Sequence, residues 1–233
     1  MTSKPTESLE TFYPETPEQW RSWLMENYTR EKGIWLIQYN KKSGKPSLSW
    51  SEAVDEALCF GWIDSLKKKL NDESSIQYFG KRKPKSAWSK INKQKIEKLI
   101  SENRMSKAGL DCIVIAKENG SWEILDSVEE LLIPEDLMLE LSRRTDATEF
   151  FHSLSKSVKK MMLQWIVLAK RPETRQKRIL EIAEAAEKKM RPKQFWPLLQ
   201  KIKTLKFPIH YYYKNKHLIL KWGFIVVYST AEN

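Results

Sequence analysis

Three residues with the side chains of familiar catalytic groups lie close together in the chain. They are Cys59, Asp64 and Ser65, in the stretch LCFGWIDS. A cysteine or serine nucleophile needs a nearby base, and the three histidines all lie in the second half: His152, His210 and His217. Ser65 also lacks the G-x-S-x-G turn that presents a serine nucleophile. We therefore expect no catalytic residue here, and we interpret CFGWIDS as the junction between a helix and a hairpin.

Asp64 supports only a weak enzyme hypothesis, as a general base beside Arg82 or Lys85. Neighbouring cations lower the pKa of a carboxyl group and make its carboxylate a poorer base. We expect Asp64 instead to pair with Arg82 or to cap a turn, and so to arrange the basic segment that follows. A protein without enzymatic activity is favoured, and an enzyme of unknown reaction is the second alternative.

A dense run of basic residues follows this junction. Residues 67–98 hold eleven Lys or Arg and three acids, a net charge of +8. Three aromatic residues are interleaved with the cations: Tyr78, Phe79 and Trp88. Such a surface can hold phosphates and stack bases, which predicts a site for nucleic acid or a phosphorylated ligand. The alternative is a solvated basic face whose aromatic rings lie in the core.

The composition argues against several classes of cofactor-dependent protein. The 233 residues carry a formal net charge of +11, which favours anionic partners. The seven glycines form neither a G-x-G-x-x-G nor a G-x-x-x-x-G-K-S/T phosphate loop. No Cys-x-x-Cys or His-x-x-x-His pair is present to hold a metal. We expect no cofactor and no metal site.

The sequence is typical of a cytoplasmic protein. The opening stretch MTSKPTESLETFYPETPEQW has no apolar core of a secretory signal. The longest apolar run, HLILKWGFIVVYS at residues 217–229, is interrupted by Lys221 and is too short to cross a bilayer. Cys59 and Cys112 lie in separate apolar stretches, which predicts free thiols in a reducing compartment.

The helices and strands predicted around the candidate site residues indicate an α+β fold. We expect helices at 16–28 and 49–61, and strands at 33–42, 63–70 and 75–83. Ser49 and Glu52 have the spacing of a capping box at the start of the second helix. The turn NDES joins the last two strands into a hairpin. The fold class is thus α+β, with a small N-terminal antiparallel sheet and helices, followed by a C-terminal helical module.

Three parts are expected along the chain. Residues 1–86 form the α+β part, residues 87–190 the helical module, and residues 191–233 a basic, aromatic extension whose one acid is Glu232. The run at 217–229 predicts either a strand added to the sheet or a poorly specified extension, and both interpretations stay open. No pattern indicates an oligomeric state.

Four blocks resemble, in order and spacing, a single bacterial family. They are EKGIWLIQYNKKSGKPSLSWSEAVDEALCFGWIDS, RKPKSAWSKINK, NRMSKAGL and WIVLAKRPETRQKRI. Together they resemble the YdeI/OmpD-associated family, over the chain from about Trp20 to Met190. The resemblance implies an α+β protein with a helical C-terminal module. It also implies a link to bacteriocin or antimicrobial-peptide tolerance and to envelope stress, and offers no catalytic residues to carry over.

The family blocks also contain a candidate ligand-binding site. Its residues are the polar and aromatic motif positions that cluster in the first two blocks: Trp62, Asp64, Arg82, Lys83, Lys85, Trp88, Ser89 and Asn92. Contact with an outer-membrane porin, which the family name suggests, is not expected without an export signal. The leading hypothesis is a non-enzymatic contribution to bacteriocin tolerance, with nucleic-acid or phosphorylated-ligand binding as the alternative.

Overall fold

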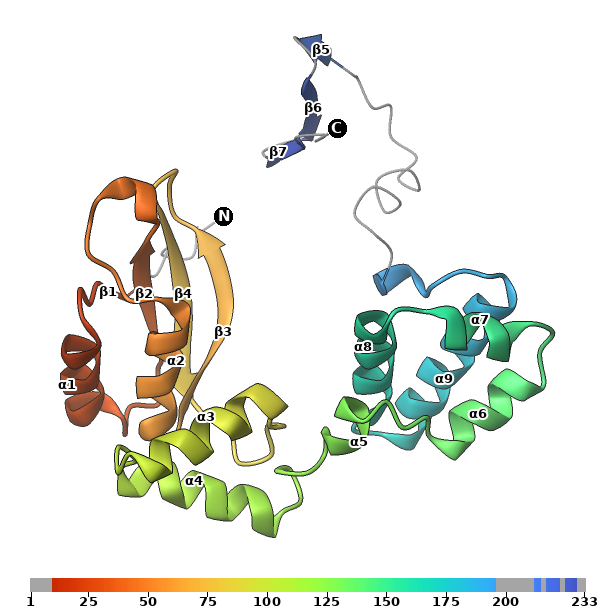
Figure 1. The fold of residues 1–233 in the computed structure, drawn as a ribbon, viewed down its shortest axis with the longest axis horizontal. Helices are drawn as coiled ribbons and strands as arrows, with labels where there is room; N and C mark the ends of the chain where they lie inside the picture. Colours follow the sequence, from red (N-terminus) through yellow and green to blue (C-terminus); the bar gives the residue numbers. More distant parts are fainter. Residues whose placement is uncertain (1–9, 196–211, 215–216, 223–224, 230–233) are drawn as a thin grey trace, which may run out of the picture. The chain divides into compact units, whose positions relative to one another are not determined.

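The computed structural model describes residues 10–195, 212–214, 217–222 and 225–229 (Figure 1). The chain divides into two compact units. The first holds the chain up to Glu135 together with Leu163–Arg175, and the second holds Asp136–Met162 and the residues from Gln176 onward. All eight candidate site residues belong to the first unit.

A four-stranded sheet forms the centre of the first unit. Its strands are β1 (Thr11–Phe12), β2 (Ile34–Tyr39), β3 (Trp62–Lys69) and β4 (Ser74–Lys81), in the spatial order β1-β2-β4-β3. β4 pairs antiparallel with both β2 and β3, which confirms the predicted hairpin, whereas the short β1 runs parallel to β2. Leu36 and Gln38 share one face of the sheet with Gln77, because Gln77 lies opposite Leu36 and side chains alternate along a strand.

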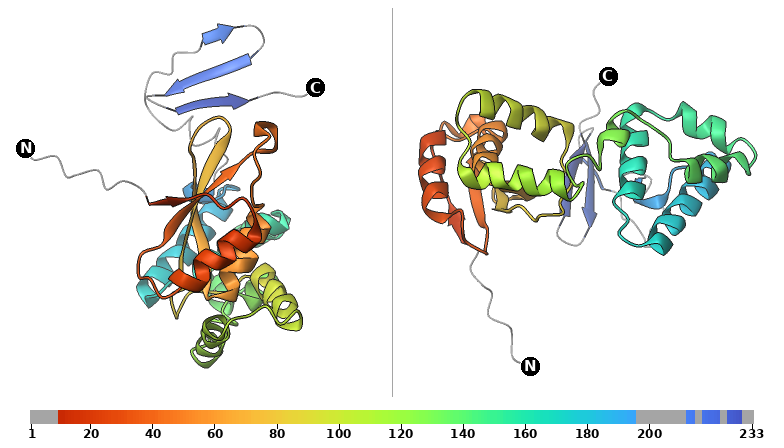
Figure 2. Two further views of the ribbon diagram at one scale, coloured as in Figure 1. Left: turned by 90° about the vertical axis from the view of Figure 1, so that its left-hand side faces the viewer. Right: turned by 90° about the horizontal axis from the view of Figure 1, so that it is seen from below.

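Two helices cover the face of the sheet that carries Leu36. They are α1 (Pro17–Asn27) and α2 (Trp50–Cys59), and the left view of Figure 2 shows α1 in front of the strands. The predicted capping box between Ser49 and Glu52 opens α2. Between β2 and α2 the chain makes a short 3-10 turn, η1 (Lys41–Ser43). The sheet and both helices enclose an apolar core that includes Trp20 and Phe79, each fully buried.

Two further helices complete this core. They are α3 (Lys90–Ser101) and α4 (Lys107–Glu118). Leu99 of α3 and Ala116 of α4 are buried in the same cluster as the sheet residues. The domain boundary expected at residue 86 stays a prediction, and the two helices that follow it share the hydrophobic core of the sheet.

The chain continues as helices, which confirms the α+β class. They are α5 (Asp126–Glu129), α6 (Glu135–Ser142), α7 (Ala147–Ser153), α8 (Lys156–Val167) and α9 (Pro172–Glu187), followed by a 3-10 turn, η2 (Lys193–Phe195). In the second unit, the Arg144 guanidinium bonds the carboxylates of Glu140 on α6 and Glu187 on α9, at 3.0 and 3.2 Å. This arginine therefore ties two helices of that unit together.

The end of the chain contains a separate sheet. β5 (Tyr212–Lys214), β6 (His217–Trp222) and β7 (Ile225–Ser229) form three antiparallel strands in that order. The interpretation of residues 217–229 as a strand added to the first sheet is wrong, because β6 and β7 pair with each other instead. Residues 196–211 lie outside the described part of the chain, and the boundary expected at residue 190 stays a prediction.

Candidate functional site

The junction between α2 and β3 brings together three distant segments. Gly61 ends α2 with a φ of 72°, and its carbonyl oxygen accepts a hydrogen bond from Arg82 N at 2.9 Å. The carbonyl oxygen of Cys59 accepts from both the backbone N and the Oγ of Ser106, just before α4. A Cβ at Gly61 would lie 2.6 Å from the Sγ of Cys112, so only glycine fits this approach. The end of α2 therefore fixes where the Arg82 segment and α4 meet.

Arg82 is buried beside this junction without a carboxylate partner. Its side chain stacks on Trp88, with the guanidinium carbon 3.6 Å from the ring centroid, and its Nη2 donates to the carbonyl oxygen of Ala87. The residue is 7% exposed and Trp88 is 2% exposed. Among the described residues, no group accepts a hydrogen bond from the Nε or Nη1 of Arg82. Two donor nitrogens of a buried cation are thus left unsatisfied, an arrangement that native proteins rarely tolerate.

The electrostatics of Arg82 follow from that burial. Burial lowers the pKa of the Arg82 guanidinium to about 10, while the electrostatic influence of Cys112 and Asp64 opposes the shift. The group therefore still carries its charge at neutral pH. A buried cation without a paired anion is strongly unfavourable, so an anion placed near this guanidinium would be bound favourably.

A cavity of about 400 Å³ adjoins the guanidinium. It is lined by Glu31, Lys81, Arg82, Lys83, Pro84, Trp88, Cys112 and Ile115. Three cations and one carboxylate among these residues give the wall a positive balance. We call this space the Arg82 cavity. Its volume is that of a small-molecule site.

The loop that carries Arg82 and Lys83 is held in place from outside. The carbonyl oxygen of Pro84 accepts hydrogen bonds from Asn119 Nδ2 at 3.0 Å and from Ser121 Oγ at 3.2 Å. Trp88 also packs on Trp122, with ring centroids 4.9 Å apart. These contacts fix the loop against the end of α4, so the cavity wall is organised before any ligand arrives.

Three of the eight predicted site residues line the Arg82 cavity: Arg82, Lys83 and Trp88. Lys85 is exposed on the same loop, outside the cavity lining. Ser89 caps α3 by accepting a hydrogen bond from the backbone N of Asn92, so this pair has a structural role. Trp62 is fully buried, and its indole Nε1 donates to the carbonyl oxygen of Tyr28 at 2.8 Å.

Asp64 does not form the predicted pair with Arg82. Its Oδ2 accepts hydrogen bonds from Trp50 Nε1 at 2.9 Å and from Gln77 Nε2 at 3.0 Å. Asp64 lies on β3 opposite Phe79, so its side chain is on the sheet face that α1 and α2 cover, where it meets Trp50 of α2. It acts on Arg82 only through space, and it orients an indole instead of the basic loop.

Several residues of the cavity were missed by sequence reasoning. Glu31, Cys112 and Ile115 come from segments remote from the basic run, whereas Lys81 belongs to the run itself. No local pattern marks Glu31 or Ile115. The one usable signal was Gly61, because a left-handed glycine at a helix end often allows another segment to approach closely.

The two thiols lack the features of reactive nucleophiles. Both cysteines are free, with Cys59 buried and Cys112 half-buried. Burial raises the pKa of each thiol above its usual value of 9.0, and the thiolate is the reactive form. Across the described residues, no group of three or more His, Cys, Asp or Glu side chains is arranged to hold a metal ion.

The basic segment does not form one continuous cationic surface. Four of its lysines pair with acids: Lys69 with Asp72, Lys93 with Asp126, Lys95 with Asp55, and Lys98 with Glu102. Phe79 and Trp88 lie in the core and offer no ring face to a base. The Arg82 cavity, and not an extended stacking surface, is the clearest anion-attracting feature of the segment.

Two family models match separate stretches of the chain. Residues 130–189 match the family described as bacteriocin-protection, YdeI or OmpD-associated. The matched residues, which include the helices from α6 to α9, form a YdeI/OmpD-associated domain. Residues 12–112 match a separate domain of unknown function, DUF8412, which contains the first three of the four resemblance blocks. The YdeI/OmpD-associated match therefore includes the fourth block and leaves the Arg82 cavity outside it.

No curated protein and no solved structure matches the chain. Among the described helices, none is both long and apolar enough to cross a membrane.

Proposed function

We propose that this chain is a non-enzymatic protein that binds a small anionic ligand in the Arg82 cavity. One observation carries the proposal, namely the buried Arg82 guanidinium with two unsatisfied donor nitrogens beside a cavity. Phosphate and carboxylate groups are the usual partners of a guanidinium. Lys81 and Lys83 in the wall add positive charge, and the volume of about 400 Å³ suits a metabolite-sized ligand.

A small ligand fits these observations better than nucleic acid. Stacking of single-stranded bases needs exposed aromatic faces, whereas Phe79 and Trp88 are at most 2% exposed. Several lysines of the segment are also engaged by acids. Titration with single- and double-stranded DNA and RNA at low salt distinguishes the two ideas. Binding tighter than that of small anions, with a steep salt dependence, would favour the nucleic-acid alternative.

The direct test is calorimetric titration with inorganic phosphate, glucose 6-phosphate and citrate. Lys83→Ala removes an exposed charge from the cavity wall, and Lys85→Ala removes one from the same loop outside it. We expect Lys83→Ala to weaken binding about fivefold and Lys85→Ala to leave it within about twofold. Equal effects of the two substitutions, or no binding of any of the three anions, would overturn the proposal.

We further propose that the protein contributes to bacteriocin or antimicrobial-peptide tolerance, or to the response to envelope stress, from the cytoplasm. The YdeI/OmpD-associated domain at 130–189 supports the tolerance role, and the two free thiols suit a reducing compartment. Deleting the gene and measuring survival with several bacteriocins and polymyxin tests it. Restoration by the wild-type gene but not by a Lys83→Ala gene would connect tolerance to the cavity. Unchanged killing curves in the deletion strain would contradict the tolerance role.

A further inference from the structure

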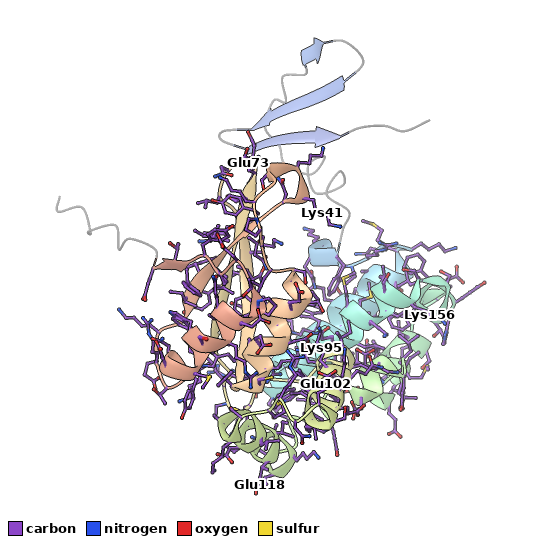
Figure 3. The ribbon with its side chains drawn as sticks, turned by 60° about the vertical axis from the view of Figure 1, so that its left-hand side comes forward. Lys41, Glu73, Lys95, Glu102, Glu118 and Lys156 are labelled. Carbon is purple, nitrogen blue, oxygen red and sulfur yellow. The ribbon has the colours of Figure 1, made fainter. Side chains whose placement is uncertain are left out.

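A second cavity lies at the opposite end of β4 from Arg82. It has a volume of about 530 Å³ and lies where β2 ends, beside the β3–β4 turn and the start of α2. The residues that matter for its chemistry are Gln38, Lys41, Leu48, Trp50, Lys67 and Ser75. Figure 3 shows Lys41 and Glu73, another lining residue, at the same end of the first sheet. We call this space the Gln38 cavity.

Gln38 places an unsatisfied amide in the wall of this cavity. The side chain is 7% exposed, and among the described residues its Nε2 has no hydrogen-bond acceptor. It follows Leu36 on the same face of β2 and lies opposite Ser75 of β4. An apolar residue at position 38 would continue the core, so a buried glutamine there is costly unless something bonds to it. The amide can donate and accept, which suits the mixed edge of a planar heterocycle.

Trp50 supplies an oriented aromatic wall. The residue is 43% exposed, although its Nε1 is held by Asp64 Oδ2 at 2.9 Å. Asp64 is itself held by Gln77, so the indole has little freedom to turn. Leu48, 5% exposed, adds an apolar lining surface. A fixed indole beside an apolar surface favours the stacking of a planar ring.

Two lysines in the wall have uncompensated charge. Within the described part of the chain, neither Lys41 nor Lys67 has a carboxylate within ion-pair distance. Of the other charged groups of the wall, Lys69 pairs with Asp72 and Glu73 pairs with Lys45, whereas Glu52 accepts a hydrogen bond from the backbone N of Ser49 and keeps its negative charge. The two unpaired lysines, from η1 and β3, outweigh the single unpaired carboxylate of Glu52, so the unpaired charges of the Gln38 cavity have a positive balance.

We propose that the Gln38 cavity binds a mononucleotide-like ligand, with its planar base stacked on Trp50, the edge of the base hydrogen-bonded to Gln38, and its phosphate near Lys41 and Lys67. This site shares no lining residue with the Arg82 cavity. The proposal goes beyond the proposed function because the Gln38 cavity would select a ligand with a planar aromatic ring, whereas the Arg82 cavity would select only for negative charge. Phosphate alone does not satisfy the amide or the indole.

The test follows the indole N–H resonance of Trp50 in two-dimensional NMR of the full chain, assigned with Trp50→Phe. AMP should shift this resonance, whereas adenosine and ribose 5-phosphate should bind at least about tenfold more weakly, because each lacks one of the two groups. Lys67→Ala should weaken AMP binding about fivefold. Lys68→Ala is the matched control, since Lys68 lies on the same strand but stacks over Trp35 on the other face.

The outcomes separate this proposal from the proposed function. Lys83→Ala should leave the AMP-induced shift of Trp50 unchanged even where it weakens anion binding at Arg82. An equal loss of AMP affinity in Lys67→Ala and Lys68→Ala would mean that AMP is attracted unspecifically to a basic surface. Ribose 5-phosphate binding as tightly as AMP, or no shift of the resonance at roughly 5 mM AMP, would overturn the inference.

Discussion

The guanidinium of Arg82 lies 3.6 Å above the ring of Trp88, and among the described residues no carboxylate is paired with it. Stacking stabilises the cation by about 0.5–2 kcal/mol, which does not offset the cost of burying an unpaired charge. The arginine is therefore better explained by a ligand than by the stability of the fold.

Replacing Arg82 with Met should separate stability from binding. The side chain keeps much of its length but loses its charge, so we expect the ligand-free protein to be unchanged or about 1–4 kcal/mol more stable. Anion binding should be lost. Urea unfolding monitored by circular dichroism, together with calorimetric titration, checks both effects. Destabilisation by more than about 3 kcal/mol would show that Arg82 serves the fold instead.

The free energy of unfolding should depend on pH because Arg82 is buried. Its folded pKa of about 10 lies well below that of an arginine in the unfolded chain, so at pH values between the two the unfolded state binds more protons. The burial penalty is fully present below about pH 10 and is relieved as the pH rises above that value, with a slope of at most about 1.4 kcal/mol per pH unit. The difference in the free energy of unfolding between wild type and Arg82→Met, measured from pH 8 to 11, isolates this effect. A difference that stays constant over this range would contradict it.

Cys112 offers a chemical reporter of the Arg82 cavity. Its raised pKa predicts slow alkylation by iodoacetamide near neutral pH, with a rate that increases at alkaline pH. Because Cys112 lines the cavity, saturating phosphate or citrate should slow the reaction further. Mass spectrometry measures both, and the fully buried Cys59 serves as an internal control. Equal protection of the two thiols would indicate general stiffening of the protein and no occupancy of the cavity.

Gly61→Ala should destabilise the first unit through two separate effects. The left-handed φ of 72° costs a side chain about 1–2 kcal/mol, and contact with Cys112 Sγ adds about 1–3 kcal/mol. Gly120→Ala is the control, because Gly120 has a similar φ of 75° and a Cβ added there would meet no atom within 4 Å. Thermal unfolding should show the larger loss for Gly61→Ala. Similar losses for the two variants would mean that the close approach of α4 contributes nothing.

Truncation after Phe195 should leave a protein that melts cooperatively. The hydrophobic core of the first unit is assembled from residues that precede this position, and β5–β7 pair with one another. Terminal segments without partners in a core contribute little stability, so the melting temperature should change by less than about 3 °C. Aggregation of the shortened chain, or a larger decrease in its melting temperature, would show that the last residues belong to the fold.

The predictable parts of this protein are those determined by neighbouring residues. The capping box at Ser49 and the hairpin around residues 71–74 follow from local hydrogen bonding and turn chemistry, and both were confirmed. The Arg82 site was only partly predictable, since Lys83 and Trp88 adjoin Arg82 in the chain. Glu31 and Cys112 reach it through tertiary packing, which no local pattern encodes.

The prediction that Asp64 pairs with Arg82 was wrong for the same reason, because tertiary packing decides the partners of Asp64. Sequence proximity to a basic run made Arg82 its expected partner, but strand register and the shift between Asp64 and Lys67 determine what the carboxylate meets. The correct partners, Trp50 and Gln77, belong to elements whose relative placement was not deducible from spacing. Charge complementarity alone is therefore a poor guide to the partner of a strand residue.

β4 connects the two cavities, because it begins beside Ser75 and continues directly into Arg82. A strand advances about 3.3 Å per residue, so the two sites are held roughly 20 Å apart. Direct electrostatic coupling across that distance is small at physiological ionic strength, where the Debye length is about 8 Å. The two occupancies should therefore be thermodynamically independent, and the strand works as a rigid spacer. A single molecule that occupied both cavities would need a linker of matching length, and its avidity would measure that spacing in solution.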